Sequence, residues 1–173
     1  MIVTIGGPIG SGKTTVAKTI AEKFGFTHIS AGVVFRELAH DKGITLEQFS
    51  KLAEENPKYD RELDARQIEL AKAAKNAVID GRLSGIIMDA DLKVWLKAPL
   101  EVRAKRASER DGKDYSIALE DVRVRGDSEL KRYREIYGID LRDLKPYDIV
   151  INTELFNAEE VIEIVEKAIS CMR

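Results

Sequence analysis

Residues 2–14 read IVTIGGPIGSGKT, and this stretch decides the fold of the chain. Its first four residues are β-branched and largely apolar, which is typical of a short buried strand. Glycines follow at once, and apolar residues at helical spacing over 13–24 predict a helix directly after them. Between strand and helix, two glycines separated by four residues precede Lys13 and Thr14, which is the phosphate-loop pattern. The sequence therefore predicts a loop that binds the phosphates of a nucleotide.

The residue types of this loop suit that chemistry. Glycines permit backbone conformations that turn several N–H groups inward, and the following helix adds the positive end of its dipole. Lys13 can reach the β- and γ-phosphates, and Thr14 offers a hydroxyl to Mg²⁺. Asp80 ends a later predicted strand, and we expect it to hold the same ion through water. Thr14 and Asp80 are thus the predicted metal-binding residues.

The rest of the chain alternates short apolar runs with amphipathic segments. Strands are predicted over 26–29, 76–80, 92–97 and 148–152, and helices over 33–41, 46–55, 59–74, 99–109, 117–137 and after Asn157. Buried strands that alternate with helices pair in parallel, so we expect a three-layer α/β fold with a five-stranded parallel sheet. The length of 173 residues fits one domain. The helical stretch 33–75 is too long for a simple crossover and predicts a small insert.

The composition argues against several classes of protein. The net charge is −2, from 28 Lys and Arg against 30 Asp and Glu, which does not favour a nucleic-acid partner. With Cys171 as the one cysteine and only His28 and His40, neither a disulfide framework nor a zinc cluster is expected. No apolar run approaches the roughly 18 residues of a membrane span, and the N-terminus lacks a signal-peptide pattern. We therefore expect a cytoplasmic protein with no membrane partner and, lacking an obvious apolar patch, a monomer.

Binding a nucleotide leaves several activities open. A GTPase would carry an Asn-Lys-x-Asp base reader, which the chain lacks. A water-activating ATPase often has a Glu beside the acidic residue of a neighbouring strand, whereas Gly81 and Arg82 follow Asp80 here. Phosphoryl transfer to a small acceptor needs cations around two sets of phosphates and a cover against water, and this class is favoured. A nucleotide-binding module without turnover is the alternative.

Arginines occur where such cations are needed. Arg36 lies six residues after Ser30, and Arg82 lies two residues after the strand 76–80, both at the sheet edge where α/β folds bind ligands. Further arginines flank the polar loop 111–115: Arg103, Arg106 and Arg110 before it, and Arg123, Arg125, Arg132 and Arg134 after it. Because a guanidinium can hold two phosphate oxygens, this pattern predicts a lid that closes over phosphates. Interleaved acidic residues leave an ordinary solvated face as the alternative.

Segments spread over nearly the whole chain carry a resemblance to a known family. They are GGPIGSGKTTVAK (6–18), HISAGVVFRELA (28–39), VIDGRLSG (78–85), SELKRY (128–133) with YGID just after it, and YDIVINT (147–153). In these segments the chain resembles the nucleoside monophosphate kinases, and within them the archaeal branch of the cytidylate kinases. The resemblance implies a P-loop kinase fold over residues 1–173, with 33–75 as the insert that binds the acceptor monophosphate and about 106–118 as the lid.

The resemblance also implies roles for individual residues. The ATP phosphates would be held by Gly7, Pro8, Ile9, Gly10, Ser11, Gly12, Lys13, Thr14 and Thr15. The acceptor nucleotide would contact Ser30, Gly32, Arg36, Gly81, Arg82 and Glu129. Catalytic groups around the transferring phosphoryl would be Lys13, Arg36, Arg82, Arg106, Arg110, Arg125 and Arg132. The turn after Asn152 would border the adenine.

The residue that reads the acceptor base does not carry over from the family. The bacterial branch has an acidic residue directly after the Asp-Gly-Arg turn, whereas Leu83 stands here. Cytosine offers an amino donor beside two acceptors, so its reader needs a carboxylate or carbonyl with a cation or amide. Candidates in the insert are Asp60, Arg61, Asp64, Arg66 and Gln67, with Asp60 and Asp64 on one helical face. We expect phosphorylation of CMP and dCMP by ATP with Mg²⁺; AMP, UMP or a small metabolite are alternative acceptors.

Overall fold

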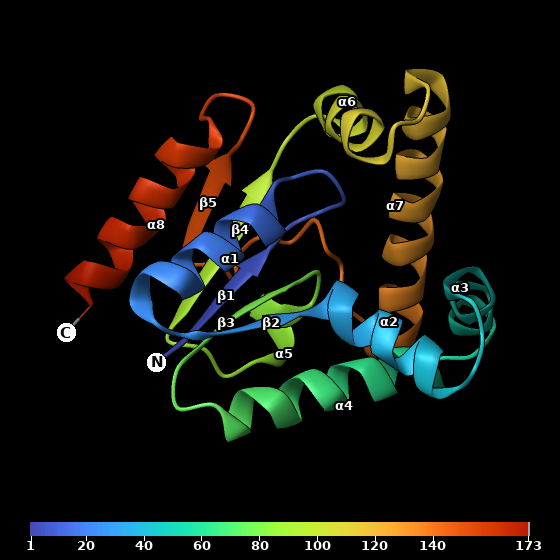
Figure 1. Ribbon diagram of the computed structural model, residues 1–173, viewed down its shortest axis with the longest axis horizontal. Coiled ribbons are helices and arrows are strands. Elements are labelled where there is room, and N and C mark those ends of the chain that lie inside the picture. The colour runs from blue at the N-terminus through green and yellow to red at the C-terminus, as the bar shows by residue number, and fades with distance from the viewer. Residues whose placement is uncertain (173) are drawn as a thin grey trace.

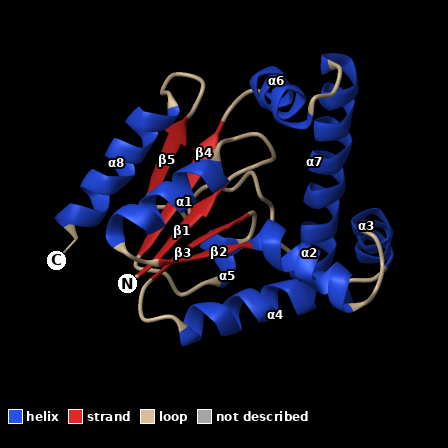
Figure 2. Ribbon diagram, in the orientation of Figure 1, coloured by secondary structure: helices blue, strands red, loops and turns tan. Residues whose placement is uncertain are grey.

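The computed structural model describes residues 1–172, with side chains except at positions 46 and 47. Its strands form one sheet: β1 (Ile2–Gly6), β2 (Thr27–Ser30), β3 (Ala77–Gly81), β4 (Leu92–Lys97) and β5 (Ile149–Asn152). The strand order is β2-β3-β1-β4-β5 and all four pairings are parallel (Figure 2). The predicted α/β fold with a five-stranded parallel sheet is confirmed, with each strand within one residue of its expected bounds.

Helices cover both faces of this sheet (Figure 1). α1 (Lys13–Phe24) and α8 (Ala158–Cys171) pack on one face, while α4 (Lys58–Ala73) and the short α5 (Ser84–Ile87) lie on the other. The remaining helices are α2 (Ala31–Asp41), α3 (Leu46–Glu55), α6 (Leu100–Asp111) and α7 (Tyr115–Tyr137). In Figure 1, α7 runs from α6 to the group of α2, α3 and α4, across the end of the sheet where the strands finish.

The main core lies between the sheet and the α1–α8 layer. Val3, Val94, Ile20 and Val165 are fully buried there, because the strands and both helices turn their apolar faces to this layer. Each such side chain contributes about 1.5–3 kcal/mol relative to an exposed position. A smaller cluster fixes Ile9, at the tip of the phosphate loop, against α6 and α7. The apolar pattern of the sequence thus holds both the scaffold and the loop.

Parallel pairing gathers the carboxyl ends of the strands at one edge. Gly6 pairs with Gly81 and with Trp95, and Ser30 pairs with Asp80. The segments that follow β1, β2 and β3 therefore start side by side. Open parallel sheets bind their ligands outside the carboxyl ends of the strands, at the point where the strand order changes direction.

Three local expectations need correction. The polar loop predicted over 110–115 is shorter, because α6 continues to Asp111 and ends at Gly112, which has φ 62°, and Asp114 caps α7 by accepting a bond from Ser116. α2 begins at Ala31, two residues earlier than predicted. The four-residue α5 was not predicted, since so short a helix leaves no periodic pattern in the sequence. The division into an insert over 33–75 and a lid over 106–118 stays a prediction.

No helix in residues 1–172 combines the length and the apolar character that crossing a membrane requires.

Candidate active site

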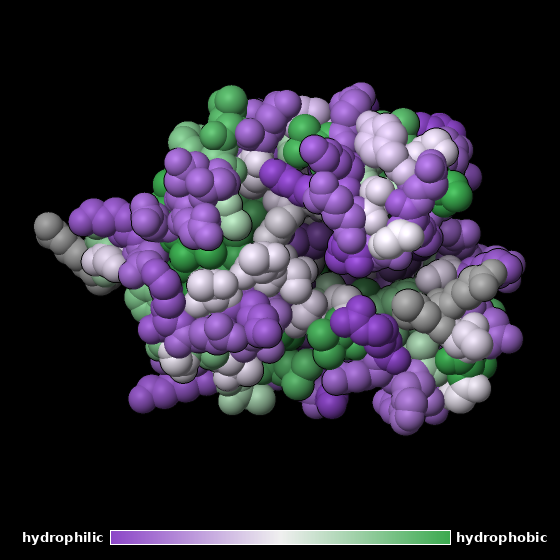
Figure 3. Space-filling view, turned by 45° about the horizontal axis from the view of Figure 1, so that its top comes forward, coloured by the Kyte–Doolittle hydropathy of each residue, from purple (hydrophilic) through white to green (hydrophobic). Residues whose placement is uncertain are grey.

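A cavity of about 1020 Å³ opens at the carboxyl edge of the sheet. In Figure 3 it appears as a hollow near the centre of the molecule, bordered by hydrophilic side chains. Its lining includes these sequence-predicted residues: Ile9, Gly10, Ser11, Gly12, Lys13, Thr14, Thr15, Ser30, Gly32, Arg36, Asp80, Gly81, Arg82, Arg106, Arg110 and Arg125. Residues predicted for two nucleotides and for the metal thus share one cavity. Gly7, Pro8, Asp60, Asp64, Glu129 and Arg132 are not among the residues that line it.

The phosphate loop forms one wall of this cavity. Gly10 and Gly12 have φ of 78° and 89°, in the left-handed region that glycine adopts without steric cost. α1 begins directly after Gly12, and no side chain caps its first turn. The leading N–H groups of that helix are therefore available to an anion, and the helix dipole favours negative charge there.

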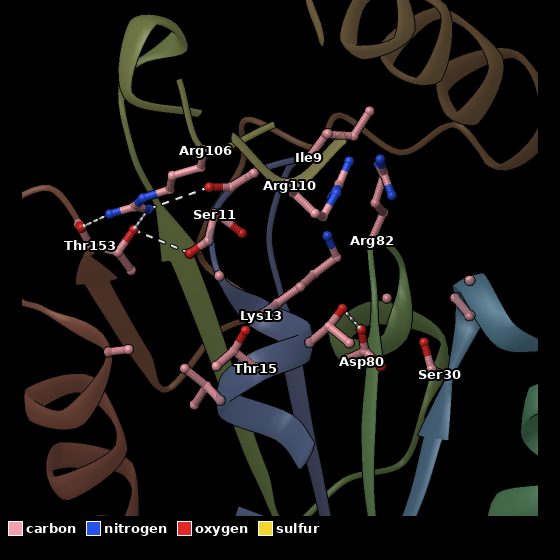
Figure 4. Close-up of a pocket in the computed structure, with 18 of the residues that line it drawn as sticks. Ile9, Ser11, Lys13, Thr15, Ser30, Asp80, Arg82, Arg106, Arg110 and Thr153 are labelled. Atoms are coloured by element: carbon pink, nitrogen blue, oxygen red, sulfur yellow. Dashed lines mark hydrogen bonds between the residues drawn. The ribbon is translucent and has the colours of Figure 1, made fainter. Parts of the chain in front are cut away.

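Lys13 extends from the start of α1 into the cavity, toward Arg82 and Arg110 (Figure 4). Its Nζ donates to the Pro8 carbonyl at 3.3 Å. Burial of the amino group, together with the nearby Arg82 guanidinium, lowers the pKa of Lys13 from 10.5 to about 7. An anion between Lys13 and Arg82 would relieve this electrostatic crowding.

Asp80 lies at the end of β3, and three neighbouring side chains hold its carboxylate. Thr14 donates from Oγ1 to Asp80 Oδ2 at 2.6 Å, and His28 Nε2 lies 3.0 Å from Oδ1. Burial would raise the pKa of Asp80, but hydrogen bonds from His28, Thr14 and Ser30 outweigh it and lower the pKa below its usual value. The carboxylate is therefore ionised and fixed in orientation.

Thr14 and Asp80 fit a Mg²⁺ ion that shares its coordination with phosphates. A hydroxyl and an ionised carboxylate are hard oxygen ligands, and Mg²⁺ usually keeps several waters and substrate oxygens beside one or two protein ligands. Within residues 1–172 no group of three or more His, Cys, Asp or Glu residues is arranged to hold a metal.

Several arginines converge on the cavity from different elements. Arg36 comes from α2, Arg82 from the turn after β3, and Arg125 from α7. Arg82 forms an ion pair with Glu129 of α7, and both side chains are mostly buried. Burial and Arg82 lower the pKa of Arg125, whereas Glu129 opposes the shift. Arg36 and Arg125 are exposed and Arg82 is half-buried, so a cluster of cations that outnumbers its carboxylates stands open to phosphates at this cavity.

Arg132 and the predicted carboxylates of α4 lie outside this cluster, at the contact of α4 with α7. Arg132 Nε is 3.1 Å from Asp60 Oδ2, and Tyr137 donates its hydroxyl to Asp64. Burial raises the pKa of both carboxyls, that of Asp64 to about 6. The sequence placed Asp60 and Asp64 on one helical face, and that face packs against α7 in the structure.

The contacts of two residues of the site, His28 and Thr153, were not predicted. His28 contacts Asp80; the available signal was its position two residues before Ser30, on the same face of β2. Thr153 follows β5, is 5% exposed, and bonds to the phosphate loop and to Arg106. The turn after Asn152 was expected beside the adenine, but the bonds that Thr153 makes there were not predicted, because its partners lie far away along the chain.

Comparison with known proteins identifies the family. A profile of the cytidylate kinase-like family matches residues 2–155. A cytidylate kinase from Archaeoglobus fulgidus is 51% identical over 98% of this chain and 94% of its own length. The chain belongs to the cytidylate kinase-like family. A second member, the cytidylate kinase of Methanocaldococcus jannaschii, is 48% identical over 100% of this chain and 99% of its own. The predicted membership of this family is confirmed.

Solved structures share the fold of this cytidylate kinase-like chain. An uncharacterised protein from Eubacterium ventriosum superposes with a TM-score of 0.73 at 22% identity, over 99% of both chains. Shikimate kinase from Bacteroides thetaiotaomicron superposes with a TM-score of 0.62 at 16% identity, over 98% of both chains. At this identity the likeness concerns the fold alone, and it agrees with the predicted kinase architecture.

Proposed function

We propose that the protein transfers the γ-phosphoryl group of ATP to CMP, giving ADP and CDP. One observation carries the proposal: the phosphate loop faces a second group of cations, Arg36, Arg82 and Arg125, across a single cavity. A protein that only binds a nucleotide needs one set of phosphate ligands, whereas a kinase that joins two nucleotides needs two. Membership of the cytidylate kinase-like family supports CMP as the acceptor.

The reaction is an in-line displacement at the γ-phosphorus. An α-phosphate oxygen of CMP forms the new bond, and the bond between γ-phosphorus and the β–γ bridging oxygen breaks, so that its electron pair leaves with ADP. The attacking oxygen is already anionic, so no strong general base is required. The protein supplies position and electrostatic stabilisation, which account for most of the catalysis in phosphoryl transfer.

Each wall of the cavity has a part in this proposal. The ATP phosphates contact the loop 7–15, and Lys13 offsets charge on the β- and γ-groups. Ser30, Gly32 and Gly81 border the acceptor, with Arg36 and Arg82 on its phosphate and Glu129 on its ribose. Arg106, Arg110 and Arg125 approach the transferring group from the side of α6 and α7.

Thr14 and Asp80 are the residues that would hold Mg²⁺, Thr14 directly and Asp80 through water. When bound, the ion neutralises charge on the β- and γ-phosphate oxygens. Thr14 and Asp80 are preoriented for this by their mutual hydrogen bond of 2.6 Å, and His28 keeps the Asp80 carboxylate in place at 3.0 Å.

Asp60 and Arg132 carry the hydrogen-bonding groups that the cytosine base needs. Neither lines the cavity and Asp60 is buried, so base binding here requires the contact of α4 with α7 to open. The carboxylate can accept from the 4-amino group while the adjacent guanidinium donates to N3 and O2, so the pair complements the hydrogen-bonding edge of cytosine. Uracil would present an oxygen to the carboxylate, and an unpaired buried acceptor is penalised. Asp64 lies one turn along the same buried face and supports this role.

A coupled assay over CMP, dCMP, UMP and AMP, with ATP and Mg²⁺, tests the function. We expect CMP and dCMP to give the highest kcat/KM, and Lys13→Ala to reduce turnover by roughly 10³-fold while the protein stays folded. A preference for AMP would overturn the acceptor, and normal turnover of Lys13→Ala would overturn the mechanism. A monomer in the cytoplasm without a nucleic-acid partner remains a prediction, and gel filtration tests the oligomeric state.

A further inference from the structure

The backbone carbonyls of the phosphate loop are held from outside the loop. Three consecutive carbonyls, those of residues 9–11, each accept a hydrogen bond from a distant side chain. Arg103 Nη1 donates to the first at 3.3 Å, Arg106 Nη1 to the second at 3.3 Å, and the Thr153 hydroxyl to the third at 3.1 Å. The donors belong to α6 and to the residue after β5, at least 94 positions away along the chain.

These bonds fix the direction of the neighbouring N–H groups. In a planar trans peptide the carbonyl of one residue points opposite to the N–H of the next. Holding the carbonyls of Ile9 and Ser11 outward therefore turns the N–H groups of Gly10 and Gly12 the other way, and both glycines line the cavity. A peptide flip in this loop would present an oxygen to phosphate in place of a donor.

The anchoring side chains also support one another. Arg106 donates to the Thr153 hydroxyl at 2.8 Å and to the Thr153 carbonyl, while Arg103 Nε donates to the Ala98 carbonyl at 3.0 Å. Figure 4 shows Arg106, Thr153 and Ser11 joined in this way. Gly10 lies so close to α6 that a Cβ there would be 2.5 Å from the Arg103 carbonyl oxygen. The loop is therefore tightly seated between α6 and the end of β5.

We propose that Arg103 and Thr153 are positioning residues that keep the phosphate loop in its anion-binding conformation before ATP arrives. They act through the carbonyls of Ile9 and Ser11; Thr153 lines the cavity as well, whereas Arg103 is not among its lining residues, so Arg103→Met tests the anchoring apart from contact with the nucleotide. Without them the loop samples conformations whose N–H groups are misdirected, and binding must then order the loop. The inference rests on the proposed function only in taking the ATP phosphates to bind at this loop.

Thr153→Val and Arg103→Met test the proposal in the full chain, by nucleotide titration and by amide exchange of the nucleotide-free protein. Valine keeps the shape of threonine and removes the donor, so we expect ADP to bind about three- to tenfold more weakly. CMP, titrated separately by calorimetry, should bind within twofold of the wild type. Amide exchange of residues 9–12 should be faster in both variants. Thr153→Ser, which keeps the hydroxyl, should restore ADP affinity, and Thr27→Val at the exposed start of β2 should match the wild type.

Unchanged ADP affinity in folded Thr153→Val and Arg103→Met proteins would overturn the proposal. So would an equal loss of ADP and CMP affinity, because a general loss of structure affects both nucleotides. Failure of this proposal can be distinguished from failure of the proposed function. A wild-type protein that binds ADP but does not phosphorylate CMP would refute the function and still allow the anchoring residues to be tested.

Discussion

Lys13 has a lowered pKa in a site that must accept several negative charges. Burial and the Arg82 guanidinium bring its pKa to about 7, so at pH 8 the amine is mostly neutral and at pH 6 it is charged. Phosphates beside Lys13 favour the ammonium form and raise the pKa again. ADP binding should therefore take up close to one proton at pH 8 and far less at pH 6. Calorimetry in buffers of different ionisation enthalpy measures this uptake.

Lys13→Met is the control for that measurement, because it removes the titrating group while keeping the length of the side chain. Its proton uptake at pH 8 should be close to zero. Equal uptake by the wild type and the variant would mean that another group titrates on binding.

Asp60 is the residue on which base selection is expected to depend. Asn at position 60 can turn either its oxygen or its NH₂ to the base, so it accepts cytosine and uracil alike. We expect Asp60→Asn to lower the ratio of kcat/KM for CMP over UMP by at least about tenfold, within the 1–3 kcal/mol of a single polar contact. Steady-state kinetics with both acceptors measures it.

Asp41→Asn serves as the matched control, because Asp41 lies exposed at the end of α2. It should leave the CMP to UMP ratio unchanged. An unaltered ratio in folded Asp60→Asn protein would show that the base is read elsewhere.

At the scale of elements, the contact of α4 with α7 is polar where most helix contacts are apolar. Asp60, Asp64 and Gln67 are buried on α4, and Arg132 and Tyr137 face the two carboxylates from α7. Buried ion pairs of this kind add little net stability, because desolvation offsets much of the attraction. The retention of such groups in a small enzyme is consistent with a role in binding.

Asp64→Asn should make the protein more stable at neutral pH. Burial raises the pKa of Asp64 to about 6 from 3.8, while the Tyr137 hydrogen bond opposes the shift and Asp60 adds to it. The folded state therefore binds a proton more tightly than the unfolded state, and stability is lost as pH rises from about 4 through 6. The shift of the pKa from 3.8 to about 6 corresponds to about 3 kcal/mol in the free energy of unfolding. Urea unfolding of both proteins at pH 3.5 and 7.5 measures the difference.

The two proteins should have similar free energies of unfolding at pH 3.5, where the carboxyl is protonated in the folded state and mostly protonated in the unfolded state. At pH 7.5 the variant should be the more stable by up to that amount. A difference that is the same at both pH values would contradict the raised pKa of Asp64.

At the scale of the whole molecule, both nucleotides must bridge the sheet edge and the α6–α7 pair. The cavity takes Arg106 and Arg110 from α6 and Arg125 from α7, opposite Lys13 and Arg36. When these arginines bind the phosphates of both nucleotides, α6 and α7 should be held against the sheet. We expect amide exchange over 106–118 to slow markedly when ADP and CMP are both bound, and much less with CMP alone. Hydrogen–deuterium exchange with mass spectrometry measures it, and no change with both nucleotides would refute the predicted lid.

Local pattern was enough to predict the layers and one wall of the site. Alternating apolar runs predict the strands because buried parallel strands leave continuous apolar stretches. The glycine spacing before Lys13 predicts the phosphate loop, since glycine reaches left-handed φ that other residues avoid. The parallel topology then brings Ser30, Asp80 and Arg82 to the same edge as that loop. These features depend on neighbours in sequence or on the general rules of parallel sheets.

Tertiary structure alone decided which partner each charged side chain takes. Arg132 is paired with Asp60 and Arg82 with Glu129, and neither pairing could be predicted from the sequence; a role of Arg132 at the phosphates stays a prediction. Arg106 bonds to Thr153 across 47 residues, and His28 to Asp80 across 52. Helical spacing gives the face on which a side chain lies, but the partner depends on how helices cross. That crossing is set by the packing of the whole molecule, which no local stretch of sequence contains.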